Sequence, residues 1–408
     1  MTPTPHTDPA GPGPDPRAAA ARHRRRRFLP LAAAVPAVLV LAACGQGAAE
    51  SNTPPPAAAT GAAAVSGAAG AGAPAAGGAL RLVPLPPGEL GAPSVPAPAA
   101  STAPGAVPHD PAVAVYNAYG TDAAPGVFPR TVRHGTGTTE LPRAPQRVLP
   151  LDSGELDSVV QLGVKPIGYL DHDPRLMPDY LVEALKGLPT VGTLAEPNLE
   201  AIAALAPDLM LTSKIRHEQL ADRLKAIGPT VFGERTGVVW KQNFALHARA
   251  MGREAQADAT VKEYEARVKA LNAALPSPRP TVSVVRVTAT NLRYYQRANY
   301  SGTILNDLGF PRPAAQNVDD FALLNQSLET LGPMGDADVI VVCPTEGEQM
   351  GLLREMRNSG LWQNLGAVKQ GRVLMALDDV WMAGIGYRSA GVILEDIARF
   401  FKVQGARG

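Results

Sequence analysis

Two stretches of the chain, 129 residues apart, follow almost the same pattern. Asn198-Leu199-Glu200 is followed by an apolar run and then by Asp208-Leu209-Met210-Leu211. Ser327-Leu328-Glu329 precedes Asp338-Val339-Ile340-Val341, so Glu and Asp are eight residues apart in the first copy and nine in the second. Each copy predicts a capped helical turn that carries a Glu, and then an apolar strand. The repeat therefore predicts two similar α/β lobes with one Glu at an equivalent place in each.

Strand-like and helix-like segments alternate around both copies. Apolar runs that predict strands lie at 147–151, 167–170, 230–232, 281–287 and 371–376, and helix-like patterns lie at 218–227, 352–365 and 389–401. This alternation is typical of an α/β fold with mostly parallel sheets. We therefore expect two Rossmann-like lobes with mostly parallel sheets.

One long helix is predicted between the two lobes. The segment 253–275 carries one apolar stripe at steps of three and four residues, made by Val261, Tyr264, Val268, Leu271 and Leu275. Three prolines from Pro276 to Pro280 end the helix. A single helix offers no multi-strand hinge, so we expect small opening motions between the lobes.

The first 44 residues have the form of an export signal. A basic run from Arg22 to Arg27 precedes mostly apolar residues from Phe28 to Ala43, too few for a confident bilayer span. The run ends in Leu41-Ala42-Ala43-Cys44, which resembles a bacterial lipobox. We expect Cys44 to carry the lipid, palmitate included, and to anchor the chain on the extracytoplasmic face of the cell membrane. An ordinary secretory signal is the alternative, and Sec and twin-arginine export both stay open.

The chain divides further by composition. Residues 45–127 are rich in Ala, Pro and Gly and predict a disordered tether, with short order around 113–119 left open. The expected divisions are therefore the signal at 1–44, the tether at 45–127, an N-terminal lobe at 128–252, the bridging helix at 253–278 and a C-terminal lobe at 279–408.

Charge and motifs exclude several functions. The net charge of +1 gives no electrostatic case for nucleic acid. No two histidines have the spacing of a ligand pair, and Asp171-His172-Asp173 is better explained as a solvated loop, so we expect no protein metal site. The sequence has no Walker loop, nucleophile elbow or zinc-protease helix, which argues against an enzyme. The short Gly384-Ile385-Gly386 motif predicts close backbone approach to a ligand or a tight turn.

The loops after the strands are the expected ligand site, because α/β sheets bind ligands beyond the carboxyl ends of their strands. These loops supply aromatic and Arg side chains, which suit a planar ligand or one rich in anionic oxygen. The candidate ligand-binding residues are Tyr169, His172, Arg216, Arg293, Tyr294, Tyr295, Trp381 and Tyr387.

From about residue 128 onward, the chain resembles the ferric-siderophore-binding lipoproteins of ABC importers, the class III periplasmic binding proteins. The matching phrases include Leu162-Gly163-Val164-Lys165-Pro166-Ile167-Gly168, the two Leu-Glu phrases, Ile227-Gly228-Pro229-Thr230-Val231, Leu292-Arg293-Tyr294-Tyr295, Ser301-Gly302 with Leu305 and Leu308-Gly309, and Asp379-x-Trp381 with Gly384-Ile385-Gly386. Their order and spacing carry the resemblance, since each phrase alone is weak.

The resemblance implies roles for particular residues. Arg293 would contact oxygens around the iron, and Trp381 would pack on the siderophore. Glu200 and Glu329 would form salt bridges with arginines on the two permease subunits, although a carboxylate in a first helical turn is also favoured by the helix dipole alone. The iron would stay chelated by the siderophore, with no cofactor and no protein ligand to the metal.

The resulting prediction is a lipid-anchored receptor that delivers a ferric siderophore, of hydroxamate type by preference, to an ABC permease dimer. Haem or cobalamin is the alternative within the same fold, with Tyr294, Tyr295 and His172 as possible axial ligands to haem. A lipid-anchored enzyme and a ligand-sensing adaptor without a transport role are alternatives of other classes.

Overall fold

The structure is a computed structural model that describes residues 110–172, 177–335, 337–345 and 350–403. The predicted signal, Cys44 and the predicted tether up to residue 109 lie outside the described residues.

The N-terminal lobe is built on parallel strands. Its central sheet has the order β3-β6-β7, formed by Val148–Pro150, Leu209–Ser213 and Thr230–Gly233. A parallel pair, β4 (Tyr169–Asp171) and β5 (Thr190–Thr193), extends the lobe. The helices of this lobe are α3 (Ser153–Gln161), α4 (Asp179–Ala184), α5 (Leu199–Ala204), α6 (Lys214–His217) and α7 (Ala221–Ile227), with a 3-10 turn at Glu218–Leu220. Strands and helices alternate as predicted.

The folded region begins earlier than predicted. Residues 110–127, assigned to the tether from their composition, include the helix α2 (Pro111–Val115) and a 3-10 turn at Tyr116–Ala118. The Tyr116 side chain is buried, and its hydroxyl oxygen accepts the Glu234 backbone N–H at 2.8 Å. Asp110 pairs with Arg235 at 2.9 Å. The predicted boundary at residue 127 is therefore corrected to about residue 110, because aromatic anchors fix this Ala- and Pro-rich segment to the lobe.

A hairpin of β1 (Arg130–His134) and β2 (Gly137–Leu141) follows, with Val132 opposite Thr139. Alternating burial along β1 places Val132 in the core of the lobe. The hairpin was not predicted, because polar residues occupy most of both strands.

Two consecutive helices join the lobes. The helix α8 (Trp240–Met251) ends at Gly252, whose φ of 67° is a left-handed conformation that glycine adopts without strain. The helix α9 (Glu254–Ala274) follows and corresponds to the predicted long helix. From the predicted stripe, Tyr264, Leu271 and Leu275 are buried, whereas Val261 and Val268 are only half-buried.

The C-terminal lobe has one five-stranded sheet of order β10-β9-β8-β11-β12. The strands β8 (Val282–Val287), β11 (Val339–Pro344) and β12 (Val373–Met375) are parallel. At one edge, β9 (Leu292–Tyr295) and β10 (Ala322–Gln326) run antiparallel. The sheet is therefore mixed, because the short turn at 288–291 returns the chain directly beside β8.

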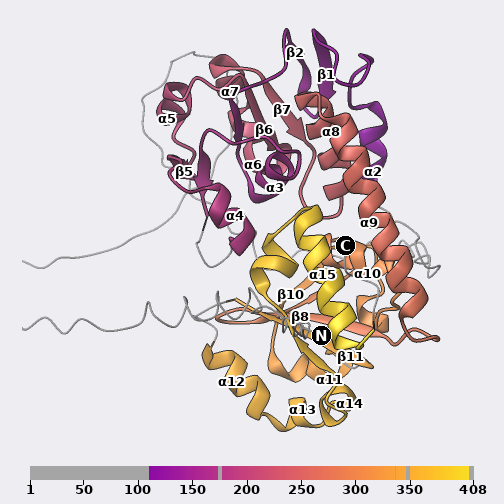
Figure 1. The fold of residues 1–408 in the computed structure, drawn as a ribbon. Helices are drawn as coiled ribbons and strands as arrows, with labels where there is room; N and C mark the ends of the chain where they lie inside the picture. Colours follow the sequence, from indigo (N-terminus) through magenta and orange to yellow (C-terminus); the bar gives the residue numbers. More distant parts are fainter. Residues whose placement is uncertain (1–109, 173–176, 336, 346–349, 404–408) are drawn as a thin grey trace, which may run out of the picture. The chain divides into compact units, whose positions relative to one another are not determined.

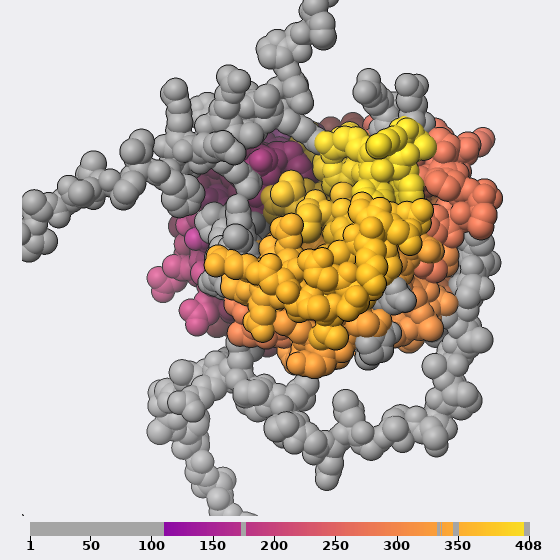
Figure 2. Space-filling view, turned by 90° about the horizontal axis from the view of Figure 1, so that it is seen from below, coloured from indigo at the N-terminus to yellow at the C-terminus, as the bar shows by residue number. Residues whose placement is uncertain are grey.

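Helices cover both faces of this sheet (Figure 1). They are α10 (Tyr300–Asp307), α11 (Leu331–Gly335), α12 (Met350–Asn358), α13 (Gly360–Gln363), α14 (Gly366–Lys369) and α15 (Tyr387–Phe400), with 3-10 turns at Ala314–Gln316 and Leu328–Thr330 and a π-helical turn at Asp379–Ala383. The single helix predicted at 352–365 is divided, because Ser359 caps α13 by accepting the Trp362 N–H at 3.2 Å. Seen from below, orange to yellow residues of this lobe form the near surface (Figure 2).

The two lobes share one hydrophobic core. Trp240, at the start of α8, lies edge-on to Tyr387, Tyr300 and Tyr264 at ring-centroid distances of 4.6, 5.3 and 5.7 Å. Its Nε1 donates to Thr303 Oγ1 at 2.9 Å. Residues of α8, α9, α10 and α15 meet here, so neither sheet can be separated from the other without exposing apolar and aromatic surface.

The helix α3 carries acidic side chains into the interior of the protein. Glu155 is 1% exposed, and both of its carboxylate oxygens are buried without a hydrogen-bond partner among the described residues. Burial and the nearby charge of Asp152 raise the pKa of Glu155 to about 8. The Glu155 carboxyl is therefore protonated at neutral pH in the folded protein.

Replacing Trp240 by Ala should lower the free energy of unfolding by about 3–5 kcal/mol, because it opens a cavity in the shared core and leaves Thr303 without its donor. Urea titration followed by circular dichroism would measure the change. The matched control is Leu361→Ala, since Leu361 is 45% exposed on α13. A Trp240→Ala variant as stable as that control would contradict the assignment of a shared core.

Replacing Glu155 by Gln should change how stability depends on pH. The folded protein keeps the Glu155 proton up to a pH of about 8, whereas the unfolded chain releases it near 4.5. The wild type therefore loses unfolding free energy as the pH rises between these values, and the variant lacks that loss. Urea titrations at pH 5 and pH 8 would measure the free energy of unfolding of both proteins. Between these pH values, that of the variant should rise relative to that of the wild type by on the order of a few kcal/mol. A difference that does not vary with pH would contradict the burial of an ionisable Glu155.

Candidate functional site

A buried carboxylate organises the carboxyl ends of the N-terminal strands. Asp152 follows β3, is 3% exposed and caps α3 by accepting the Ser153 N–H at 2.7 Å. Arg216, after β6, donates its Nε to Asp152 Oδ2 at 2.7 Å. His172, after β4, places Nε2 3.3 Å from Asp152 Oδ1 and Nδ1 2.7 Å from the Leu170 carbonyl oxygen. Three strand ends thus supply one cluster, which we call the N-cluster: Asp152, His172 and Arg216.

The charges of the N-cluster support one another. Burial alone would raise the pKa of Asp152, but His172 and Arg216 hold it well below its usual range. Burial alone would lower the pKa of His172, but its hydrogen bond to Asp152 raises it above the ordinary value. The cationic form of His172 is therefore favoured beside the permanent charge of Arg216. One carboxylate faces up to two cations, which leaves a positive surplus for an anionic ligand.

A second charged cluster lies at the carboxyl end of the C-terminal sheet. Arg286 on β8 forms a two-pronged ion pair with Asp378, at 2.6 and 2.7 Å. Arg293 on β9 is paired in register with Arg286, so both side chains lie on one face of the sheet. Arg293 is half-buried, and its Nε is buried without a hydrogen-bond partner among the described residues. We call Arg286, Arg293 and Asp378 the C-cluster, which again holds one more cation than anions.

Both clusters adjoin the same contact between the lobes. Ser153, directly after Asp152, donates its Oγ to the Ala383 carbonyl oxygen at 2.9 Å. Ala383 ends the π-helical turn that begins beside Asp378. The chain therefore brings the carboxyl end of each sheet to one junction, as ligand binding between two α/β lobes requires.

Exposed apolar side chains border these charges. Ile215, next to Arg216, is 58% exposed, and Leu377, next to Asp378, is 56% exposed. Most large aliphatic side chains among the described residues are buried, so exposure of both beside the charged clusters is informative. The site can therefore bind a ligand that has both anionic oxygens and apolar surface.

Buried side chains include three of the predicted ligand residues, Trp381, Tyr294 and Tyr387. Trp381 is 0% exposed, and its Nε1 donates to Asp396 at 3.0 Å. Tyr294 is 0% exposed on the face of β9 opposite Arg293, in the same apolar cluster as Leu331 and Leu353. Tyr387 lies in the aromatic cluster around Trp240. Each of these rings packs inside the protein in this structure, and their contact with a ligand stays a prediction.

The remaining predicted residues differ in exposure, and Tyr295 is buried like the three above, at 5% exposed. Tyr169 is half-buried on β4. Tyr295 shares the face of Arg293, and its hydroxyl is 3.4 Å from an Arg286 nitrogen. Glu200 and Glu329 are both exposed, in the first turn of α5 and in the 3-10 turn at Leu328–Thr330.

Sequence reasoning missed Asp152, Arg286 and Asp378. Asp152 directly follows the predicted strand 147–151, so the rule of strand carboxyl ends could have found it. Arg286 is the one charged residue of a mostly apolar strand, which is also a visible signal. No sequence pattern distinguishes Asp378 from its neighbour Asp379, because its role depends on a contact with a distant strand.

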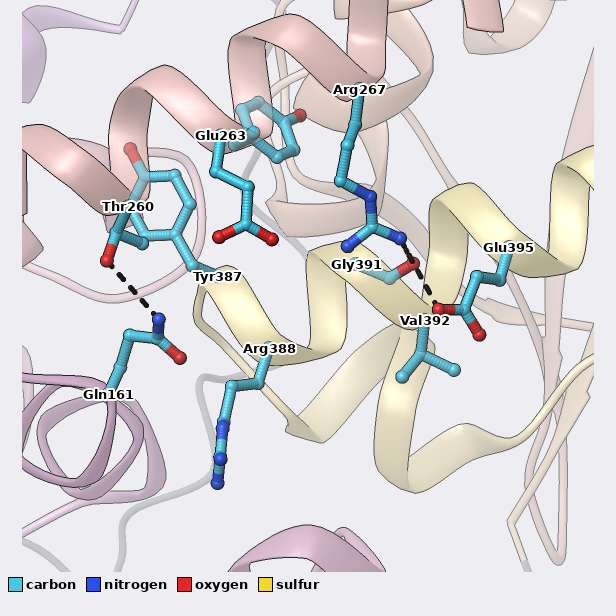
Figure 3. Close-up of a pocket in the computed structure, with 10 residues that line it drawn as sticks. Gln161, Thr260, Glu263, Arg267, Tyr387, Arg388, Gly391, Val392 and Glu395 are labelled. Atoms are coloured by element: carbon cyan, nitrogen blue, oxygen red, sulfur yellow. Dashed lines mark hydrogen bonds and ion pairs between the residues drawn. The ribbon is translucent and has the colours of Figure 1, made fainter. Parts of the chain in front are cut away.

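A hollow of about 230 Å³ lies at another place, between α3, α9 and α15 (Figure 3). Among the predicted ligand residues, Tyr387 contributes to its lining. Two hydrogen bonds lie at the border of this hollow, one from Gln161 to Thr260 and one from Arg267 to the Gly391 carbonyl oxygen. This hollow belongs to the joint between the lobes and not to the two clusters.

Within the described residues, no helix is both long and apolar enough to cross a bilayer. The same residues contain no group of three or more His, Cys, Asp and Glu side chains that could hold a metal ion.

Known proteins share this architecture. Residues 152–379 match the family model described as periplasmic binding protein. The probable siderophore-binding lipoprotein YfiY of Bacillus subtilis is 36% identical, over 67% of this chain and 87% of YfiY. The Fe(3+)-citrate-binding protein YfmC of the same organism is 30% identical, over 66% of this chain and 85% of YfmC. The crystal structure of Staphylococcus aureus SirA complexed with staphyloferrin B has a TM-score of 0.62 and 32% identity, and covers 67% of this chain and 99% of SirA.

The resemblance inferred from the sequence is confirmed by these comparisons, as is the α/β fold class. The family model spans more than half of the chain, and YfiY exceeds 30% identity over most of its own length. The chain therefore belongs to the periplasmic binding protein family, whose members bind substrates and are not enzymes.

Proposed function

We propose that this protein is an extracytoplasmic receptor that captures a ferric siderophore and delivers it to an ABC permease. The observation that carries the proposal is the pair of clusters at the carboxyl ends of the two sheets, each with a cationic surplus and an exposed aliphatic neighbour. The name of YfiY, which refers to a siderophore, supports the same ligand class.

The charges favour a chelate with anionic oxygens, such as carboxylates. A guanidinium group donates parallel hydrogen bonds that match carboxylate geometry, and Arg216 and Arg293 supply one such group from each lobe. The hydroxamate preference inferred from sequence rested on Arg293 together with Trp381, and Trp381 is buried. The name of YfmC, which refers to Fe(3+)-citrate, also agrees with carboxylate oxygens. Hydroxamate chelates remain an alternative for the ligand test.

Haem is a weaker candidate for a specific reason. Tyr294 lies on the opposite face of β9 from Arg293. Each ring nitrogen of His172 faces a protein oxygen, from Leu170 or Asp152, so neither is directed away as an axial ligand. The iron of a siderophore needs no protein ligand, and the cationic clusters suit the chelate and not a bare ferric ion.

Glu200 and Glu329 are the proposed contacts to the permease dimer. Both are exposed at the start of a helical turn, at equivalent places in the two lobes. Hydrogen bonding to Ser327 lowers the pKa of Glu329, which keeps it charged. Anchoring through a lipid on Cys44 is part of the same proposal, since it would hold the receptor near its permease.

Replacing Arg293 by Ala should weaken binding of a carboxylate-type ferric chelate by about ten- to a hundredfold, because one charged hydrogen-bond partner is lost. Quenching of Trp fluorescence by ferric citrate, ferric hydroxamates, ferric catecholates, haem and cobalamin would rank the ligands and give each Kd. Arg372→Ala is the control, since Arg372 is exposed beside the opposite end of the sheet. An unchanged Kd for the best ligand would contradict the role of Arg293, and haem binding alone would contradict the siderophore proposal.

Replacing both Glu200 and Glu329 by Ala should leave ligand affinity unchanged and abolish uptake, because the two carboxylates would face the permease and not the ligand. Uptake of the iron-labelled chelate by cells that express the variant would measure this. A matched control replaces Glu196 and Glu355, which are also exposed. Uptake equal to that of the control would refute the docking role.

A further inference from the structure

The edge strand β10 has an irregular register directly beside Arg293. Its pairing with β9 advances three residues along β10, from 323 to 326, but only two along β9, from 294 to 292. Two residues of β10, Leu324 and Asn325, therefore lie opposite Arg293 alone, as in a β-bulge. Asn325 has a φ of 55°, in the left-handed region that few residues other than glycine adopt. Bulges often lie next to functional sites, where they change the direction of a side chain.

Leu324 lies on the face of the sheet that carries the C-cluster. Successive side chains of a strand alternate between its two faces. Ala322 packs against the shared core on the face of Tyr295, and Leu323 packs against the apolar cluster on the other face. The next residue, Leu324, is therefore again on the face of Arg293. Its side chain is 46% exposed, so apolar surface lies open to solvent beside this arginine.

A second exposed apolar side chain, Phe321, directly precedes β10. It is 38% exposed, and its ring meets the ring of Tyr295 edge-on at a centroid distance of 5.2 Å. The Tyr295 hydroxyl lies 3.4 Å from a nitrogen of Arg286, so Phe321 reaches the C-cluster through one tyrosine. The Phe321 carbonyl oxygen accepts the Gln296 backbone N–H at 3.1 Å and the Asn299 amide at 2.9 Å. These bonds hold the backbone of this exposed residue in place.

Apolar surface next to a cationic cluster indicates which part of a ligand binds there. A chelate would present its anionic oxygens to Arg293, and oxygens of that kind gain nothing from Phe321 or Leu324. An apolar substituent of the same chelate does gain, because contact with these side chains removes apolar surface of both molecules from water. Ferric citrate has no such substituent. The strand β10 therefore favours a chelate that joins carboxylate oxygens to an acyl or aryl group.

We propose that Phe321 and Leu324 form an apolar shelf that binds the acyl or aryl substituent of a ferric chelate, and that Asn325 is the residue that positions Leu324. We call these three residues the β10 shelf. Arg293 binds the anionic oxygens, and the shelf selects among chelates that have the same oxygens. The inference rests on the proposed function and adds to it the chemical class of the ligand's outer part.

Isothermal titration of the intact protein with two probes tests the proposal. Both probes are ferric complexes of citrate-based chelators with the same donor oxygens, one ending in N-acetyl groups and the other in N-benzoyl groups. The wild type should bind the benzoyl probe more tightly. Leu324→Ser should weaken binding of the benzoyl probe by about tenfold and change that of the acetyl probe by less than about twofold, because only the apolar contact is lost. Phe321→Ser should have the same selective effect.

The positioning role has its own pair of variants. Asn325→Gly should keep both affinities, because glycine adopts a positive φ without strain, whereas Asn325→Val should weaken binding of the benzoyl probe selectively. Equal effects of these two variants would contradict that role.

The matched control for Leu324→Ser is Leu361→Ser, since Leu361 is 45% exposed on α13. Equal affinity of the wild type for both probes, or an equal loss for both in Leu324→Ser, would overturn the shelf alone. A wild type that binds neither probe would overturn the proposed carboxylate-type ligand, and the shelf with it.

Discussion

The aromatic contact around Trp240 is the interaction on which the rest of the structure depends. It gathers Tyr264, Tyr300 and Tyr387 from α9, α10 and α15 around one indole ring, and a hydrogen bond to Thr303 fixes the orientation of that ring. The two sheets are therefore not connected by a single helix alone. A shared apolar core holds their carboxyl ends at one junction, which is the condition for a ligand to contact both lobes at once.

The N-cluster and the C-cluster lie beside this junction, one in each lobe. In each lobe, a buried carboxylate holds an arginine that would otherwise extend into solvent, and each lobe contributes one further cationic group. Such preorganisation lowers the entropic cost of ordering these side chains, which ligand binding must offset. The carboxylates also keep the total charge small, so that a dianionic chelate can be neutralised without leaving several arginines unpaired in its absence.

Much of the fold could be predicted from the sequence, because the parallel strands are apolar runs bounded by Gly, Pro and Asp, and the long helix has a regular stripe. The antiparallel strand β10 could not, because its sequence Ala-Leu-Leu-Asn-Gln has no alternating pattern and its pairing is irregular. The charged residues of the loops were partly predictable: Arg216, His172 and Arg293 follow from the rule of strand ends. Trp381 shows the limit of that reasoning, since nothing in a non-periodic loop tells which way an aromatic ring points. The links through Asp152 and Asp378 depend on tertiary contacts, which no local pattern contains.

The central claim is that one ferric chelate lies between the lobes and touches both clusters. The most direct test compares Arg216→Ala, Arg293→Ala and the double variant by isothermal titration with the best ligand of the panel. The account predicts that each single change weakens binding and that the double variant binds more weakly than either. If Arg216→Ala binds as tightly as the wild type, the ligand contacts only the C-terminal lobe, and the two-lobed site is refuted.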